Sequence, residues 1–496
     1  MNLGRPFTPV LFCECGVLFD TPVRGEYNGW WRFFHISRRR SYMPVVRKLK
    51  DGWHIHRKVK YGTMPQVLRS KMVSADDAMR AIQSCHRVFI AGNCAVPLVA
   101  YQALLRRAPE LENVELFHCI FVGPGDHTAP AMQGHLRLNT AFISGCVREA
   151  VHNGRADFTP CFLSEIPLLF RKGILPLDVA ILHVSPPDKH GFCSLGVETG
   201  LDKAASQAAR IVIAEMNEQM PRILGDSFVH ISEIDFIIPS SYPLAELRIP
   251  EPNETTNRIA QNVASLIEDG STIQTGIGDI PNAVLRFLKG KRDLGVHTEL
   301  FSDGLIELVE KGVVTGDRKT LHPGKIISGF VLGTKQLYDF VNDNPIVELH
   351  PIEYVNDPFI IAQNEKMVAI NGALEVDLTG QICADSIGHK IYSGVGGQVD
   401  FIYGASRSEG GKPIIALPST AVLSDTSRIS RIVHELKPGA SVTTSRNHVY
   451  YVVTEFGIAH LYGKTIRQRA RALISVAHPD FREELERKAR ELMHLF

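Results

Sequence analysis

The chain has 496 residues, and its 54 Lys and Arg residues nearly balance its 53 Asp and Glu residues, so the formal net charge is +1. With 44% hydrophobic and 22% charged residues, it has the composition of an ordinary globular protein, which excludes a disordered chain, a collagen-like fibre and a small disulfide scaffold. The charge is uneven, because residues 1–60 contain 12 Lys and Arg but 4 Asp and Glu. The remainder is therefore net acidic, and we expect no nucleic-acid partner.

Residues 1–60 do not have the pattern of a targeting segment. The apolar piece at 9–19 contains Glu14, and the arginines at 38–40 follow it, whereas a secretory signal begins with its positive charge. No window of the sequence reaches the roughly 18 consecutive apolar residues of a membrane span. We expect a cytoplasmic protein with no membrane partner, in which residues 1–60 form a partly disordered extension.

Candidate metal ligands are few and isolated. Cys13 and Cys15, like His54 and His56, are too close together and too far from further ligands for a tetrahedral zinc site. No metal site is predicted.

Strand and helix patterns alternate from about residue 73 onward. Ser74, with acidic residues at 76 and 77, predicts the capped start of a helix. Strand, helix and strand at this spacing are typical of a parallel sheet covered by helices. The predicted strands of the first half are 88–91, 114–117, 179–184 and 211–215, and its predicted helices include 75–84 and 97–107.

A proline-rich passage at 239–252 predicts a linker, after which the same alternation resumes. A helix is predicted over 254–268, a strand over 272–275 and a charged helix over 481–495. The fold class is therefore α/β, with two α/β domains. Their predicted ranges are 61–248 and 249–496.

The two halves share a repeat. Residues 92–118 align with residues 276–302, since both contain a glycine after a strand, a helix that begins with proline, and a strand with Glu-Leu-Phe. Glu115 in the first copy corresponds to Glu299 in the second. The second copy has an additional glycine in its turn, which permits close approach of a ligand to backbone N–H groups at a helix start. The third glycine of the dinucleotide-binding fingerprint is missing.

Several motifs occur together over about residues 65–492 and resemble one family. They are Ser185-Pro-Pro-Asp-Lys-His-Gly191, Gly276-Ile-Gly-Asp-Ile-Pro281, His297-Thr-Glu-Leu-Phe-Ser-Asp-Gly304, Leu374-Glu-Val-Asp-Leu-Thr-Gly380, Gly394-Val-Gly-Gly397 and Val453-Thr-Glu-Phe-Gly-Ile-Ala459. Together they are similar to the acetyl-CoA hydrolase/transferase family, and most of all to its 4-hydroxybutyrate CoA-transferase branch. The resemblance does not cover the first 60 or so residues.

The resemblance implies a glutamate-type coenzyme A (CoA) transferase, in which two similar open-sheet α/β domains have the active site between them. Glu299 matches the catalytic glutamate of the family, and Asn356 and Gly397 match residues that support the oxyanion. A larger residue at Gly397 is expected to weaken CoA binding. The residues expected to contact CoA are Gly276, Ile277, Gly278, Asp279, Ile280, Leu374, Gly396 and Gly397.

A carboxylate nucleophile suits the exchange of CoA between acids. It keeps the acyl group at the level of a thioester or an anhydride, so no ATP is needed, and the oxyanions that form need fixed N–H donors. CoA is expected as a substrate, with no permanently bound cofactor. The expected partners are an acyl-CoA (acetyl-, butyryl- or 4-hydroxybutyryl-CoA) and a free carboxylate such as acetate, and the family implies a homodimer.

Two other functions stay open at this point. An acetyl-CoA hydrolase would use the same residues and differ in admitting water to the intermediate, whereas a non-catalytic CoA-binding sensor would leave Glu299 idle. A glutamate at a strand end is usually a solvated surface residue, and Glu115 is expected to be one or to form an ion pair. His297 and Asp303 have orienting or structural roles, and His190 lines the substrate side or stabilises its turn.

Overall fold

The computed structural model describes residues 64–496, except residues 249, 277 and 424. The extension predicted at 1–60 lies outside the described residues. The described residues belong to one compact unit that extends to Phe496. The boundary between residues 248 and 249 stays a prediction.

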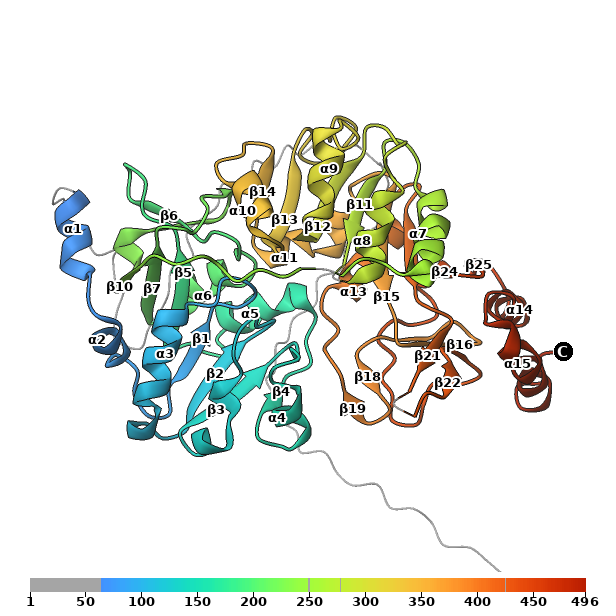
Figure 1. The fold of residues 1–496 in the computed structure, drawn as a ribbon, viewed down its shortest axis with the longest axis horizontal. Coiled ribbons are helices and arrows are strands. Elements are labelled where there is room, and N and C mark those ends of the chain that lie inside the picture. The colour runs from blue at the N-terminus through green and yellow to red at the C-terminus, as the bar shows by residue number, and fades with distance from the viewer. Residues whose placement is uncertain (1–63, 249, 277, 424) are drawn as a thin grey trace, which may run out of the picture. The chain divides into compact units, whose positions relative to one another are not determined.

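Seven strands form the first sheet, in the order β10-β7-β5-β1-β2-β3-β4 (Figure 1). All neighbouring pairs are parallel. The sheet contains all four strands predicted for the first half. Its strands are β1 (Arg87–Ile90), β2 (Val114–His118), β3 (Leu136–Thr140), β4 (Asp157–Phe158), β5 (Val179–Val184), β7 (Ile211–Asn217) and β10 (Phe236–Ser240).

The helices of the first half are short. The predicted helix 75–84 is wrong at its C-terminal end: Ser74 caps the helix by accepting from the Asp77 amide, but the helix ends at Met79. Residues 80–86 instead turn, with Cys85 in the left-handed conformation, so that β1 can begin at Arg87. The helices are α1 (Met64–Lys71), α2 (Ala75–Met79), α3 (Leu98–Arg107), α4 (Arg148–His152), α5 (Ile166–Arg171) and α6 (Asp202–Ala208).

Nine strands form the second sheet, in the order β25-β24-β20-β15-β11-β12-β13-β14-β8. Only the pair β24 and β25 is antiparallel. Because β8 belongs to the first half of the chain, both halves contribute to this sheet. Its strands are β8 (Leu224–Gly225), β11 (Thr272–Thr275), β12 (Gly295–Phe301), β13 (Ile326–Val331), β14 (Val347–Leu349), β15 (Met367–Gly372), β20 (Lys412–Ala416), β24 (Tyr451–Thr454) and β25 (Gly457–His460).

The last helix begins earlier than predicted and ends earlier. The side chain of His478 accepts from the Asp480 amide, and Pro479 occupies the first turn, so the helix starts there rather than at Phe481. The helices of the second half are α7 (Glu254–Leu266), α8 (Asp279–Arg286), α9 (Gly304–Glu310), α10 (Lys335–Val341), α11 (Ile352–Val355), α12 (Pro358–Ile361), α13 (Gln398–Arg407), α14 (Ile466–Ser475) and α15 (Pro479–Glu491).

Small sheets complete the fold. Their strands have two or three residues each. They are β6 (Phe192–Ser194), β9 (Phe228–His230), β16 (Glu375–Asp377), β17 (Ile382–Cys383), β18 (Ser386–Ile387), β19 (Lys390–Ile391), β21 (Thr420–Val422), β22 (Arg428–Ser430) and β23 (Ile432–Val433).

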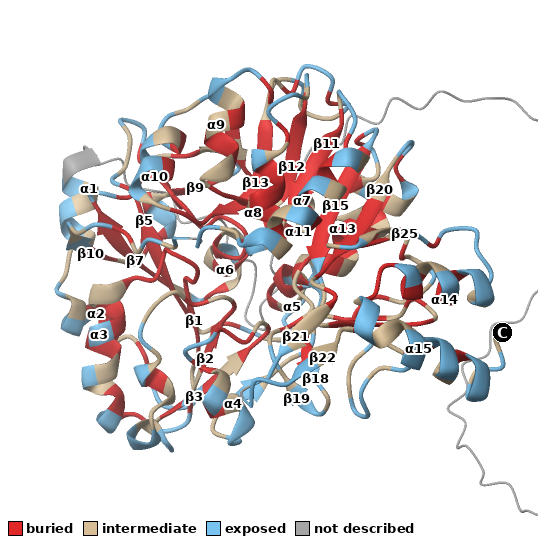
Figure 2. Cartoon of the chain, turned by 45° about the vertical axis from the view of Figure 1, so that its right-hand side comes forward, coloured by how far each residue is buried: buried red, intermediate tan, exposed pale blue. Residues whose placement is uncertain are grey.

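Both large sheets are buried by the helices around them. Every residue of β5 and of β13 is buried, as expected for parallel strands covered on both faces. Figure 2 shows this contrast between buried strands and helices with exposed outer faces, such as α14 and α15. One core cluster includes Phe89 of the first sheet and Phe301 of the second, so the two halves share a continuous hydrophobic core.

The predicted α/β fold class, with two similar open sheets, is confirmed. The repeat has the same order of elements in both halves, since β1, α3 and β2 correspond to β11, α8 and β12. Glu115 and Glu299 therefore lie on corresponding strands, each paired with the strand that precedes the glycine turn.

Candidate active site

Glu299 lies near the carboxyl end of β12. The rest of this strand is buried, from Gly295 to Thr298 and at Leu300 and Phe301, whereas Glu299 is partly exposed. Glu299 thus lies at the carboxyl-terminal ends of the parallel strands, where sheets of this kind usually bind their ligands. A carboxylate in this position is accessible without being surrounded by bulk water.

Two predicted residues hold the Glu299 carboxylate. The side-chain amide of Asn356 donates to Glu299 Oε2 at 2.9 Å, and the backbone N–H of Gly397 donates to the same carboxylate. Asn356 is fully buried and ends α11, where its backbone N–H donates to Ile352 O at 2.9 Å. The structure therefore brings together Glu299, Asn356 and Gly397, which are far apart in the sequence.

The N-terminus of α13 points at this site. Gly397 is the N-cap residue of the helix, and its N–H is one of the free donors found at every helix start. Asp400, on the first turn, is buried and lies 3.5 Å from the Asn356 amide through its Oδ2. Sequence reasoning did not assign Asp400 to the site, although it lies shortly after the glycine-rich motif.

Residues of the first half of the chain also contact the glycine-rich loop and the start of α13. Ser164 donates through its hydroxyl to Asp400 Oδ1 at 2.9 Å and through its N–H to Asp400 Oδ2 at 3.3 Å. The N–H of Leu163 donates to Gly396 O at 3.1 Å. Residues from both halves thus surround Glu299 and the loop that contacts it.

Burial dominates the electrostatics of the site. It raises the pKa of Glu299 to about 7, and the negative charge of Glu198 acts in the same direction, whereas the hydrogen bonds from Asn356 and Gly397 oppose the shift. Burial also raises the pKa of Asp400 to about 7, with a contribution from the charge of Glu299. At neutral pH these carboxyl groups compete for protons.

The glycine turn 276–280 follows β11, the strand next to β12. The N–H of Thr275, the last residue of β11, donates at 3.3 Å to the hydroxyl of Thr298, the residue before Glu299. Gly278 has a φ of +135°, which only glycine adopts readily, and it precedes α8. Gly276, Asp279 and Ile280 belong to the same turn and helix start, while Ile277 lies outside the described residues.

The other residues predicted to contact CoA lie at the same edge. Leu374 follows β15, which pairs in parallel with β11, and its N–H donates to Cys383 O at 2.8 Å. Gly396, with a φ of +58°, directly precedes Gly397. Because strands of a parallel sheet end at one edge, these segments converge with the glycine turn. Their contacts with CoA stay predictions.

Other acidic and histidine side chains of the motifs have structural contacts. Glu115 forms a two-bond ion pair with Arg87, at 2.8 and 2.9 Å, which distinguishes it from Glu299 in the repeat. His297 is buried, with Nε2 2.8 Å from Val355 O.

Asp303 and His190 also have ordinary structural roles. Asp303 accepts from the Thr334 hydroxyl at 2.6 Å and so holds the start of α10. His190 is exposed, and its N–H donates to Asp188 Oδ1 at 2.8 Å within the turn.

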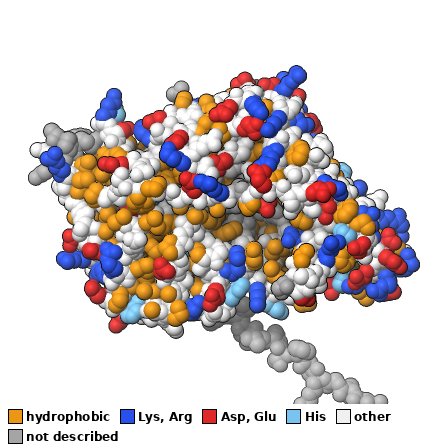
Figure 3. Space-filling model, viewed as in Figure 1, with side chains coloured by type: hydrophobic (Ala, Val, Ile, Leu, Met, Phe, Trp, Pro, Cys, Tyr) orange, Lys and Arg blue, Asp and Glu red, His pale blue; other side chains and the backbone are white. Residues whose placement is uncertain are grey.

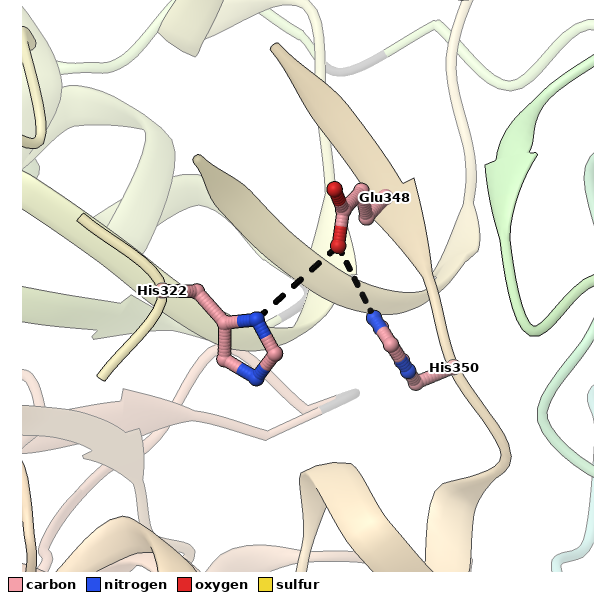
Figure 4. A group of neighbouring side chains, drawn as sticks. All are labelled: His322, Glu348 and His350. Carbon is pink, nitrogen blue, oxygen red and sulfur yellow. Dashed lines mark hydrogen bonds and ion pairs between the residues drawn. The ribbon is translucent and has the colours of Figure 1, made fainter. Parts of the chain in front are cut away.

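Among the described residues, one group brings potential metal ligands together: His322, Glu348 and His350 (Figure 4). Their ligand atoms all lie within 4.8 Å of one another. However, Lys325 Nζ lies 3.1 Å from the Glu348 carboxylate, and His322 Nε2 is hydrogen-bonded to the Tyr354 hydroxyl at 2.7 Å. A divalent cation here would lie beside an ammonium group, so we interpret this group as a network of ion pairs and hydrogen bonds.

The surface offers little charge segregation on the face shown in Figure 3, where Lys and Arg side chains lie among Asp and Glu side chains. None of the helices in the described part of the chain is long and apolar enough to cross a membrane.

Two family models match the chain. The acetyl-CoA hydrolase/transferase N-terminal domain matches residues 55–243, and the C-terminal domain of the same family matches residues 333–489. The chain therefore belongs to the acetyl-CoA hydrolase/transferase family, and it is an enzyme of the CoA-transferase class.

Individual relatives agree with this assignment. The 4-hydroxybutyrate coenzyme A transferase of Clostridium kluyveri is 52% identical over 85% of this chain and 97% of its own length. The succinyl-CoA:acetate/propanoyl-CoA:succinate CoA transferase of Fasciola hepatica is 45% identical over 91% of this chain and 96% of its own length. The crystal structure of a 4-hydroxybutyrate CoA-transferase from Porphyromonas gingivalis superposes with a TM-score of 0.75 at 43% identity, covering 86% of this chain and 99% of that chain.

Proposed function

We propose that the enzyme transfers CoA between a short-chain acyl-CoA and a free carboxylate such as acetate, with Glu299 as the covalent nucleophile. Acetyl-, butyryl- and 4-hydroxybutyryl-CoA are the proposed donors. The observation that supports this most directly is the partly exposed Glu299 carboxylate, held by Asn356 and Gly397 where both halves of the chain meet. Asn356 and the glycine loops then supply the donors that the reaction needs.

The proposed reaction has four steps, in which atoms and charge balance. The Glu299 carboxylate attacks the thioester carbonyl, the C–S bond breaks, and an acyl-glutamyl anhydride and CoA thiolate result. The thiolate attacks the glutamyl carbonyl, which releases the first carboxylate and leaves a glutamyl-CoA thioester. The second acid attacks this thioester, the C–S bond breaks, and a new anhydride and CoA thiolate form. The thiolate then attacks the acyl carbonyl of this anhydride. The new acyl-CoA leaves, and Glu299 is again a carboxylate.

The contacts of Glu299 fit both the resting carboxylate and the oxyanions. The amide of Asn356 and the N–H of Gly397 are fixed by α11 and α13, so they need no rearrangement as charge moves onto oxygen. The glycine turn 276–280 at the same edge is proposed to bind CoA. CoA enters as a substrate, and no permanently bound cofactor is part of the mechanism.

The dependence of CoA release on an acceptor acid tests transfer against hydrolysis. We expect the enzyme to release little CoA from butyryl-CoA alone and to form acetyl-CoA at a steady rate once acetate is added. Release of CoA at the same rate with and without acetate would favour the acetyl-CoA hydrolase alternative. A CoA-binding sensor would show neither reaction.

The activity should rise with pH through about 7. The raised pKa of Glu299 means that the carboxyl group is largely protonated below pH 7, and only the ionised form can attack. We therefore expect kcat/KM for the acyl-CoA to fall about tenfold per pH unit below the midpoint and to level off above it. Steady-state rates from pH 5.5 to 8.5 measure this profile, and a flat profile would contradict it.

A variant tests whether the midpoint of the pH profile reports the pKa of Glu299. Because the charge of Glu198 helps to raise the pKa of Glu299, Glu198→Gln should move the midpoint to lower pH. Glu115→Gln serves as the control, since Glu115 pairs with Arg87 on another strand, and it should leave the midpoint in place.

The proposal also covers the setting of the enzyme. We place it in the cytoplasm as a homodimer that acts on dissolved acyl-CoA and carboxylates. The resemblance to the family supports this setting.

A further inference from the structure

A small cavity lies between the two halves of the chain, next to the Glu299 site. Its apolar walls include Phe89 and Ile120 from the first half and Phe330 and Ile352 from the second. It has room for little more than a water-sized group. Two acidic residues, Glu198 and Asp202, also line it.

Asp202 lacks the partners that buried carboxyl groups normally have, and neither acid is paired with a cation in the described part of the chain. Asp202 is fully buried, and neither of its carboxylate oxygens has a hydrogen-bond partner. Glu198 is buried and accepts from the Asn93 side-chain amide and from the Leu201 N–H at 3.2 Å. Among the described residues, neither acid forms an ion pair with Lys, Arg or His. A donor from a ligand would therefore satisfy an unmet requirement of the cavity.

The cavity lies close to Glu299 in the fold. Glu198 forms a β-bridge with Phe330 in β13, and Phe330 is paired with Leu300, the residue after Glu299. The backbone of Glu198 thus lies two strand spacings, roughly 10 Å, from that of Leu300, the neighbour of Glu299. A short acyl chain attached at Glu299 fits such a separation, because both side chains shorten the remaining gap.

Two further contacts join the cavity to the residues that hold Glu299. Ile352, in the cavity wall, begins the same helix, α11, that ends at Asn356. Leu163, another wall residue, donates through its N–H to Gly396, next to Gly397. The cavity therefore lies where the far end of an acyl group is expected if Glu299 is the nucleophile.

We propose that Glu198 and Asp202 form the closed end of the acyl pocket and select acyl groups that carry a hydroxyl group at their far end. This inference rests on the proposed function. A hydroxyl donates its proton to the unpartnered Asp202, and it costs less to desolvate among apolar walls than an ammonium group. An acyl group that ends in a methyl leaves Asp202 without a partner. An acyl group that ends in a carboxylate places its charge beside two buried acids, and no cation lies there to compensate it. The pocket therefore disfavours dicarboxylic acids.

Acceptor preference of the full-length enzyme tests this inference. With acetyl-CoA as donor, we expect kcat/KM for 4-hydroxybutyrate to exceed that for butyrate by about tenfold or more, and succinate to be transferred more slowly than both. Equal use of butyrate and 4-hydroxybutyrate, or use of succinate as good as that of 4-hydroxybutyrate, would overturn the inference.

The proposed function has its own readout in the same experiment. Acetate has no group at the far end, so exchange of labelled acetate into acetyl-CoA reports transfer without the pocket's selectivity. No exchange of acetate would contradict the proposed function itself. Exchange of acetate without any preference among the longer acids would overturn only the role of Glu198 and Asp202.

Variants separate recognition from a structural role. Asp202→Leu should lower the ratio of kcat/KM for 4-hydroxybutyrate to that for butyrate by about tenfold, and Asp202→Asn should raise the relative rate with succinate. Glu215→Gln is a matched control, since Glu215 is a buried acid that accepts from the Tyr242 hydroxyl at 2.5 Å and does not line the cavity. It should leave the ratio unchanged.

An unchanged ratio in both Asp202 variants would mean that the acids only hold a buried water or the loop, and would overturn the inference. Should Asp202→Leu not fold, Asp202→Asn and the acceptor preference of the unmodified enzyme still decide the question.

Discussion

Replacing Glu299 with Gln is expected to lower kcat by about 10⁴-fold or more, because the amide cannot form the anhydride on which every later step depends. Gln has nearly the volume of Glu, and its carbonyl oxygen can still accept from Asn356, so the fold should persist. Transfer rates from butyryl-CoA to acetate, measured with thermal unfolding on the same preparation, give the result. Activity within tenfold of the unmodified enzyme would contradict the assignment.

The repeat provides a matched control for this variant. Glu115 occupies the corresponding strand of the first sheet, but its carboxylate pairs with Arg87 at 2.8 Å. Glu115→Gln should therefore leave transfer within a few-fold of the unmodified enzyme and reduce stability instead, since it removes half of a partly buried ion pair. Equal losses of activity in both variants would point to a general effect on folding.

Replacing Gly397 with Ala is expected to lower kcat/KM by about 10²-fold or more, because a displaced nucleophile loses its alignment. A Cβ at this position would lie 1.9 Å from Glu299 Oε2 and 2.2 Å from Asn356 Nδ2. The carboxylate must move, and its hydrogen bond to Asn356 must break. The φ of −95° at Gly397 is open to alanine, so the effect arises from this close approach and not from backbone strain.

The same geometry refines the expectation for CoA binding. From the sequence, a larger residue at position 397 is expected to weaken CoA binding, whereas in the structure the nearest atoms to an added Cβ belong to Glu299 and Asn356. We therefore expect a larger effect on the rate than on the affinity for CoA. Gly290→Ala is the control, since an added Cβ there has no atom within 4 Å, and its kinetics should match those of the unmodified enzyme. A Gly397→Ala enzyme with unchanged kcat/KM would contradict the account.

The layout of strands and helices could be predicted because it depends on local patterns. Buried parallel strands have continuous apolar runs, as in β5, where all six residues are buried, and each run marked a strand. The repeat then placed Glu299 on the strand that follows a glycine turn and its helix. The helix predicted over 75–84 was too long because the local signals define a start at Ser74 but not the turn that leads into β1.

The composition of the site could be predicted only in part. Asn356 lies 57 residues from Glu299 in the sequence, and Asp400 reaches the same amide only because the fold brings the end of α11 close to the first turn of α13. No local spacing contains that information. The motif resemblance supplied Asn356 and Gly397, but it gave no reason to include Asp400.

Glu198 and Asp202 could not be predicted as buried acids. They lie in a stretch with Thr199 and Gly200, which reads as an exposed loop that favours charge. Their burial results from the approach of β13 and α11 of the second half, which is a tertiary effect. A buried carboxyl group without a partner is visible only in the folded chain.

The most direct test of the central claim is to trap CoA on Glu299. The enzyme is incubated with butyryl-CoA without an acceptor and treated with borohydride or hydroxylamine, and the modified peptide is mapped by mass spectrometry. The account predicts modification at Glu299, within the peptide that contains Thr298–Phe301, and its absence in Glu299→Gln. Modification at another residue, or turnover with acetate while Glu299 stays unmodified, would contradict it.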